Sequence, residues 1–190
     1  MEKKHFVLFL VAAITWAFVM PMSRVQAETA TDACSLFTRG NAEILFKETV
    51  SEGISRDTTA PAGHSCRYSF NKKGGAYGIK VRVSTHTALQ AEGIYASAAE
   101  IMERQKNARK ASSYASKSFK EVPGHGDDAF WNGTDLWLIK GETLIIITVN
   151  AFLDIAAKDM ATLEKAKEEK NYSLSLQAAE TILSAIQETP

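Results

Sequence analysis

The sequence lacks the features that would assign it to a specialised class of protein. Lys and Arg together number 22 and Asp and Glu also number 22, so the chain has no net charge. It therefore has no global electrostatic field to attract nucleic acid or anionic lipid. There is no internal repeat and no low-complexity tract, and an apolar content of 45% excludes a disordered chain. These absences leave an ordinary globular protein.

Catalytic motifs are absent as well. The chain has no GxSxG nucleophile elbow, no SxxK with its partner motifs, no HExxH pair and no Gly-rich phosphate loop. Sequons for N-glycosylation at Asn132 and Asn171 are short matches that arise by chance. We therefore assign no catalytic residue, no metal ligand and no cofactor from the sequence.

The first 27 residues have the three parts of a secretory signal peptide. Lys3 and Lys4 precede an uncharged apolar run, Phe6 to Met20, and small residues follow up to Ala27. The run is shorter than the roughly 20 residues that a helix needs to cross a bilayer. We therefore predict cleavage after Ala27, the alternative being an uncleaved membrane anchor.

Residues 28–190 would then form a single α+β domain located in the periplasm or secreted. No second long apolar segment follows, so we expect no stable membrane anchor after cleavage. Loss of three basic residues and one acidic residue with the leader leaves a net charge of −2. The segment Thr31 to Cys34 lacks the leucine that precedes a lipid-modified cysteine, so we expect an unlipidated product.

Two cysteines, Cys34 and Cys66, are the only ones in the chain. An oxidising compartment favours a disulfide between them, and such a bond stabilises a fold by about 3 to 4 kcal/mol in the chain-entropy model. The alternative is a reactive or metal-binding thiol, but the two residues form no CxxC pair.

Hydrophobic periodicity predicts an α+β fold. Alternation predicts a hairpin of strands at 66–70 and 77–83, whereas Gly, Thr and Pro at 53–63 predict a loop. Spacings of three and four predict one amphipathic helix over 88–108. The same patterns predict a helix at 41–49 capped by Thr38, a loop at 112–118 and a strand at 119–122. Strands are expected at 129–131 and 136–140 about an Asn132-Gly133 turn, and at 144–152, where the strand is expected to be buried on both faces. A weakly amphipathic charged segment at 153–170 and a final helix at 176–186 complete the expected elements.

Several short motifs carry a resemblance to a known group. Asp32-Ala33-Cys34-Ser35-Leu36, Cys66-Arg67-Tyr68 and Val122-Pro123-Gly124-His125-Gly126-Asp127-Asp128-Ala129 resemble motifs of small secreted bacterial envelope proteins of unknown function. The resemblance implies an antiparallel sheet packed by helices, an α/β/α sandwich similar to PsbP-like folds, and a bond between the two cysteines. It implies no catalytic residues.

The loop Pro123, Gly124, His125, Gly126, Asp127 and Asp128 is the most site-like feature of the sequence. An imidazole and two carboxylates on a loop with two glycines have the chemistry to bind a metal or move a proton. The alternative is a tight turn in which the glycines adopt special backbone angles and an aspartate bonds backbone amides. A closed site would need a further ligand, such as His64 or His86.

Two other surfaces are candidates for binding. Trp131 and Trp137, with Phe130 and Tyr77, would form an aromatic wall if no helix covers them, although such residues more often belong to a core. Residues 100–120 carry six basic and two acidic side chains. That segment would meet an anionic polymer or lipid unless it is simply a solvated helix face.

Two functions follow from these observations. The preferred one is a non-enzymatic binding or accessory module that recognises an envelope protein, a peptide or a small ligand through a sheet face or the loop region 122–131. The alternative is a hydrolytic or metal-assisted enzyme centred on the loop from Pro123 to Asp128. Convergence of His64 or His86 on His125 would favour the enzyme.

Overall fold

A computed structural model describes residues 32–155 and 158–187, and the predicted leader with its cleavage site lies outside these ranges. The strands are β1 (Ile54–Thr59), β2 (Ala62–Lys72), β3 (Gly75–Ser84), β4 (Lys120–Glu121), β5 (Asp128–Trp131), β6 (Asp135–Lys140) and β7 (Thr143–Asn150). The helices are α1 (Ala33–Leu36), α2 (Arg39–Phe46), α3 (His86–Glu92), α4 (Ala98–Ala111), the 3-10 helix η1 (Ala115–Lys117) and α5 (Met160–Gln187).

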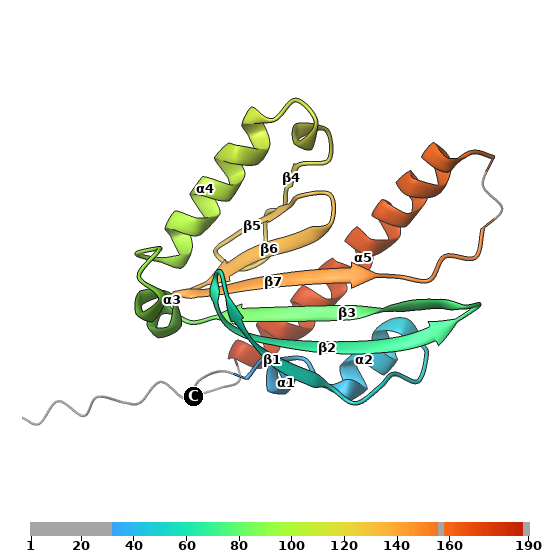
Figure 1. The fold of residues 1–190 in the computed structure, drawn as a ribbon, viewed down its shortest axis with the longest axis horizontal. Coiled ribbons are helices and arrows are strands. Elements are labelled where there is room, and N and C mark those ends of the chain that lie inside the picture. Colours follow the sequence, from blue (N-terminus) through green and yellow to red (C-terminus); the bar gives the residue numbers. More distant parts are fainter. Residues whose placement is uncertain (1–31, 156–157, 188–190) are drawn as a thin grey trace, which may run out of the picture.

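The strands form one antiparallel sheet in the order β1-β2-β3-β7-β6-β5-β4. Strands β1 to β3 make one meander and β4 to β7 make a second, which returns to place β7 beside β3. Helices α1, α2 and α5 pack on one face, whereas α3 and α4 pack on the other, and α4 lies next to the β4–β6 end (Figure 1). The expected α+β class, with a helix-packed antiparallel sheet, is confirmed.

Strand β7 is the fourth of seven and is buried on both faces. Ile145, Ile147 and Val149 belong to the core under α5, and Leu144 and Ile146 belong to the core under α3 and α4. Successive side chains of a strand point to opposite faces, so a run of apolar residues without alternation needs cover on both. The prediction of a central strand is confirmed.

Helices α3 and α4 on the second face also cover Trp137 of β6. Leu136 and Leu138 point toward α5, while Trp137 and Ile139 point toward α4. The Trp137 ring stacks on Phe130, with ring centroids 5.8 Å apart. A helix layer therefore covers these aromatic residues, as the sequence favoured.

The disulfide joins Cys34 of α1 to Cys66 of β2, with the Cα atoms 5.1 Å apart. The predicted pairing is confirmed, and no free thiol lies in the described ranges. Cys66 is fully buried, so the bond fixes α1 directly on the core. Within the same ranges, no helix combines the length and the apolar character needed to cross a membrane.

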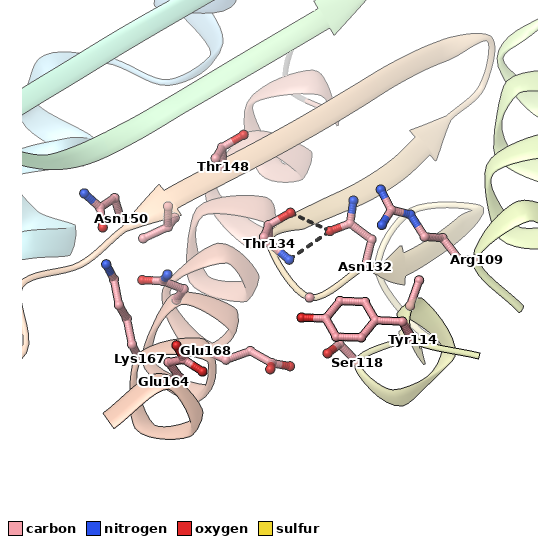
Figure 2. Close-up of a pocket in the computed structure, with 14 residues that line it drawn as sticks. Arg109, Tyr114, Ser118, Asn132, Thr134, Thr148, Asn150, Glu164, Lys167 and Glu168 are labelled. Atoms are coloured by element: carbon pink, nitrogen blue, oxygen red, sulfur yellow. Dashed lines mark hydrogen bonds between the residues drawn. The ribbon is translucent and has the colours of Figure 1, made fainter. Parts of the chain in front are cut away.

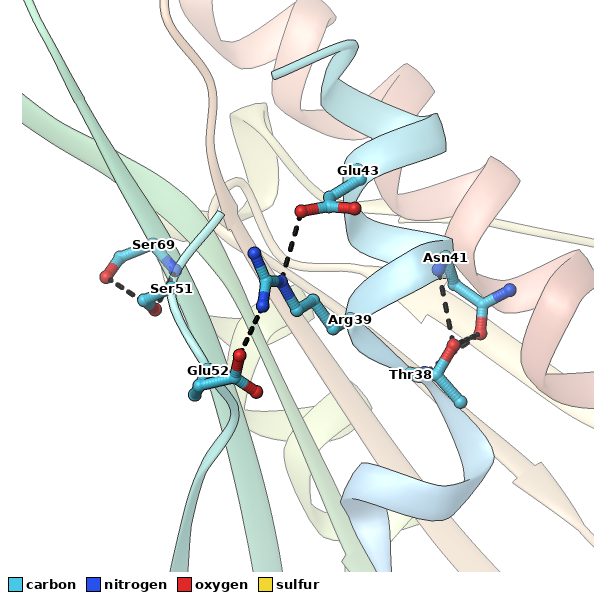
Figure 3. Close-up of polar contacts among 7 residues, drawn as sticks. All are labelled: Thr38, Arg39, Asn41, Glu43, Ser51, Glu52 and Ser69. Atoms are coloured by element: carbon cyan, nitrogen blue, oxygen red, sulfur yellow. Dashed lines mark hydrogen bonds and ion pairs between the residues drawn. The ribbon is translucent and has the colours of Figure 1, made fainter. Parts of the chain in front are cut away.

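Helix α2 begins where the capping residue Thr38 predicts. The Thr38 hydroxyl accepts from Asn41 N, and the Asn41 side-chain oxygen accepts from Thr38 N at 2.8 Å. The guanidinium of Arg39 then bonds Glu43 in the helix and Glu52 just before β1 (Figure 3). The helix ends at Phe46, earlier than expected, because Lys47 adopts a left-handed conformation with φ 55°.

The prediction of a single helix over 88–108 is wrong. Gly93 adopts φ 73° and ends α3, after which the Ser97 hydroxyl accepts from Glu100 N at 3.1 Å and begins α4. A left-handed glycine ends a helix because its backbone can turn away without a Cβ clash. Ile94, which a continuous helix over 88–108 would place on its apolar side, is instead exposed between the two helices.

Two further segments differ from expectation. The predicted loop 53–63 contains β1, an edge strand whose side chains are nearly all exposed. The segments expected at 153–170 and 176–186 share one helix, α5, which begins only at Met160. Asn171, near the middle of that helix, accepts from Ala151 N at 2.9 Å and so ties α5 to the end of β7.

We expect removal of the disulfide to destabilise the fold without changing its secondary structure. The Cys34→Ala, Cys66→Ala double variant loses the cross-link between α1 and β2, at a cost of about 2 to 4 kcal/mol. Urea denaturation followed by circular dichroism measures this difference. Equal midpoints for the variant and the oxidised wild type would contradict the prediction.

Candidate functional site

The loop from Pro123 to Asp128 connects β4 to β5 and turns at two left-handed glycines, Gly124 with φ 82° and Gly126 with φ 71°. His125, between them, is largely covered, with 18% of its side chain exposed. Its Nε2 lies 3.9 Å from Glu180 Oε1 on α5, and its Nδ1 lies 3.4 Å from the Pro123 carbonyl oxygen. The imidazole therefore faces α5 rather than the loop's own carboxylates.

The two aspartates of the loop have structural partners. Asp127 accepts from Gly141 N at 2.6 Å and from Lys140 Nζ at 3.0 Å, which fixes the loop to the β6–β7 turn. These hydrogen bonds, that from Gly141 above all, lower the pKa of Asp127 below its ordinary value of 3.8. Asp128 pairs instead with Lys106 of α4, Nζ to Oδ1 at 2.5 Å.

The other histidines have separate partners. His64 lies 2.9 Å from Asp57 on β1, and His86 lies 3.9 Å from Glu142 in the β6–β7 turn. Across the described ranges, no group of three His, Cys, Asp or Glu side chains is arranged to hold a metal ion. The arrangement is that of a tight turn held to three different elements, although the loop borders a hollow of about 390 Å³.

The four aromatic candidates divide between the two faces of the sheet. Phe130 and Trp137 stack under α4, whereas Trp131 is fully buried under α5 and contacts Tyr172 at 5.4 Å between ring centroids. Tyr77 lies in a separate aromatic group with Phe70 and Phe152. These rings therefore form no common wall.

The basic segment 100–120 is mostly neutralised by its neighbours. Its ion pairs are Arg104 with Glu100, Lys106 with Asp128, Lys110 with Glu121 and Lys120 with Glu168. Among the described residues, Arg109 and Lys117 have no hydrogen-bonding or ion-pairing partner for their side chains. The segment as a whole is a solvated face. One of its two unpaired cations, Arg109, lines a hollow that is described next.

A hollow of about 510 Å³ lies where β6 begins, opposite Thr148, and where β7 continues to Asn150 (Figure 2). We call it the notch. Its floor is the β5–β6 turn and the end of β7, one wall is the segment from Arg109 to Ser118, and the other wall is the first half of α5. The volume falls within the range of about 300 to 1,000 Å³ that is usual for small-ligand sites.

The floor of the notch is a closed hydrogen-bond network. Asn132 Oδ1 accepts from the backbone nitrogens of Thr134 at 2.8 Å and Asp135 at 2.7 Å. Asp135 in turn accepts from the hydroxyls of Thr134 at 3.1 Å and Thr148 at 2.6 Å. Because every member has a partner, these polar groups are held in place before any ligand arrives.

The two walls carry side chains without partners. Arg109 projects from α4 and Lys167 from α5 on the opposite side, and Glu164 lies beside Lys167 (Figure 2). None of the three has a hydrogen bond or ion pair within the described ranges. Tyr114 stands at the rim with 85% of its surface exposed.

One wall residue links the notch to the core. Glu168 Oε1 accepts from Trp131 Nε1 at 3.3 Å and lies 3.9 Å from Lys120 Nζ. Its carboxylate is therefore already partnered, and it connects the wall of the notch to the indole of Trp131.

Sequence patterns identified only part of the notch. The Asn132-Gly133 pair predicted a turn, and the structure places that turn at the floor, with Gly133 at φ 100°. Arg109 and Lys167 are 58 positions apart in the sequence and carry no motif that relates them. Folding places Arg109 and Lys167 on the walls of the same hollow, the notch.

Comparison with models of known families, with curated proteins and with solved structures finds no match to this chain. The site is therefore characterised by its own geometry and chemistry.

The two loop glycines give a matched pair of variants. A Cβ at Gly126 would lie 2.3 Å from the Ile139 carbonyl oxygen, whereas a Cβ at Gly124 meets nothing within 4 Å. Both positions have positive φ, so alanine costs about 1 to 2 kcal/mol at each. We expect Gly126→Ala to lower the melting temperature clearly more than Gly124→Ala. Equal losses would show that the turn is not packed as described.

The lowered pKa of Asp127 predicts a pH-dependent stability. Its carboxylate stabilises the fold above its unfolded pKa near 3.8, and the contribution is lost as the pH falls through the lower folded value. Asp127→Asn keeps the shape but not the charge. The melting temperature of the wild type should therefore exceed that of Asp127→Asn near neutral pH, and the difference should shrink as the pH falls below about 4. A pH-independent difference would contradict this assignment.

Proposed function

We propose that this chain is an exported, non-enzymatic binding module and that the notch holds its ligand, a short peptide or small polar molecule with a free carboxylate. The observation that carries the proposal is the pair of unpartnered cations, Arg109 and Lys167, on opposite walls of a preorganised polar hollow. Arg109 is half-buried and Lys167 is exposed, so both cations are available for charge-assisted hydrogen bonds with an anionic group of a ligand.

The chemistry of the walls specifies the ligand further. The guanidinium of Arg109 suits a carboxylate because its planar donors match two carboxylate oxygens. Glu164, on the facing wall, suits an amine, so a zwitterionic molecule or the end of a peptide matches both walls. Tyr114 at the rim offers an exposed ring to the rest of the ligand.

Export is supported by two independent features. The leader pattern of residues 1–27 is typical of a cleaved signal peptide, and an intramolecular disulfide is typical of proteins that fold in an oxidising compartment. The motifs around Cys34, Cys66 and Gly124 support membership of the small secreted envelope proteins that they resemble. We propose the periplasm or the cell exterior as the location of residues 28–190.

The proposed export has a direct test. We expect the protein recovered from outside the cytoplasm to begin at Glu28 when its N-terminus is sequenced. An intact Met1 on the exported protein would contradict cleavage and favour a membrane anchor.

The ligand site is tested with short peptides that differ only at the carboxyl end. In a Trp137→Phe background the emission of the exported chain comes from Trp131, whose indole contacts the notch through Glu168. We expect a tripeptide with a free carboxylate to change this emission and its amidated form to bind roughly tenfold more weakly, because a charge-assisted hydrogen bond is lost.

Two arginines of α4 provide the matched control. Arg109→Ala should weaken binding of the free peptide by roughly tenfold. Arg104→Ala should leave it unchanged, because Arg104 pairs with Glu100 and lies over Tyr95 outside the notch. Equal binding by both variants, or no response to either peptide at millimolar concentration, would overturn the proposed site.

A further inference from the structure

Half of one sheet face carries basic side chains and lacks an apolar helix layer, although α3 contacts the start of β2 at Ala62. Arg56 of β1, Arg67 of β2, and Lys80 and Arg82 of β3 share this half, which we call the basic half-sheet. The strand register places Arg67 opposite Lys80, and Ser65 between Arg56 and Arg82. On the same face, the apolar core under α3 and α4 contains no residue of β1, β2 or β3. Figure 1 shows α4 next to the β4–β6 end, away from β1 and β2.

The charges of the basic half-sheet are not neutralised from within. None of its four cations forms an ion pair in the described ranges. Asp57 of β1 pairs with His64 on the opposite face, and Glu92 on α3 accepts from Ala62 N through Oε2 while its Oε1 is buried without a hydrogen-bonding partner. The Nε of Arg82 is buried with no acceptor.

This arrangement has a cost that folding alone does not explain. Like charges directly opposite each other on neighbouring strands destabilise a sheet, and Arg67 and Lys80 are such a pair. A sequence that breaks a local rule of stability without compensation does so most often at a functional site. The basic half-sheet is therefore a candidate surface for an anionic partner.

The shape of the face favours a narrow partner. Gly78 has no side chain, and a hollow of about 180 Å³ lies beside it, lined by Arg67, Lys80, Thr148 and Asn150 among others. On the other half of the same face stands α4, and a helix is about 10 Å across. Helix α4 therefore keeps a flat bilayer from contacting the basic half-sheet, whereas a single extended chain has room to lie beside the helix.

The spacing of the charges favours an extended peptide in particular. Lys80 and Arg82 are two positions apart on one strand, about 6.6 Å, which is the repeat of alternate side chains in any extended chain. Arg67 adds a third cation on the neighbouring strand, about 4.8 Å away. Carboxylates at alternate positions of a partner segment match this pattern.

We propose that the basic half-sheet docks an acidic, extended segment of a partner protein, with acidic residues at alternate positions. Thr148 and Asn150 line both this hollow and the notch, so the docked segment would approach the notch along β7. The docking surface is nonetheless separate from Arg109 and Lys167.

The test uses the chain from residue 28 onward and a synthetic peptide of alternating Glu and Thr, measured by isothermal titration calorimetry. We expect binding that weakens as salt rises, because the contacts are between exposed charges. Arg67→Glu with Lys80→Glu should weaken it by at least roughly tenfold. Lys117→Glu with Lys165→Glu, which makes the same change of net charge at two exposed, unpaired lysines elsewhere, should leave it unchanged.

A charge exchange keeps the test independent of any loss of folding. The double variant Arg67→Glu, Lys80→Glu should bind a peptide of alternating Lys and Thr that the wild type does not bind. The single variant Lys80→Glu should raise the melting temperature, because it places opposite charges across β2 and β3. Arg109→Ala should retain peptide binding, which separates this proposal from that of the notch.

Three results would overturn the proposal. The first is equal binding of the acidic peptide by the two double variants. The second is no rescue by the basic peptide when the double variant is folded by circular dichroism. The third is sedimentation of the wild type with vesicles of anionic phospholipid but no binding of the peptide, which would make the basic half-sheet a membrane surface instead.

Discussion

The structure depends on the burial of β7 on both of its faces. Its apolar run from Leu144 to Val149 has no polar side to offer to water, so the sheet is stable only when a helix layer covers each face. Helix α5 supplies one layer, and α3 with α4 supplies the other. The strands beside β7 are covered by helices on one or both faces, whereas the edge strand β1 contributes no buried residue to either core.

The two layers are unequal, and this inequality creates the surfaces available for binding. Helices α1, α2 and α5 cover their face from β2 to β5, whereas the apolar core of the second layer takes strand residues only from β5, β6 and β7. On that second face β2 and β3 bear polar and basic residues instead of apolar ones. Strand β6 begins only opposite Thr148, whereas β7 continues to Asn150, and the notch lies beside these last residues of β7.

Local patterns in the sequence predicted the parts of this fold that local physics determines. Alternation at 66–70 and 77–83, the cap at Thr38 and the Asn132-Gly133 turn each produce one structure almost regardless of context. Strand β1 was missed because its side chains are exposed and its pairing with β2 relies on backbone hydrogen bonds. The break at Gly93 was missed because apolar spacing continues across it, although the glycine itself was a usable signal. The notch and the basic half-sheet combine distant segments, and no single window of sequence contains them.

The basic half-sheet is tied to the core by the alternation of β2. Cys66 and Tyr68 point into the core, and Arg67 between them points to the open face. A shift of the register by one residue would bury Arg67 and expose both neighbours, and it would also separate Cys66 from Cys34. The disulfide and the core therefore fix the backbone positions from which the basic side chains of this face project. A partner that docks on this face therefore meets a backbone that needs no rearrangement, although the long basic side chains still lose rotamer freedom on binding.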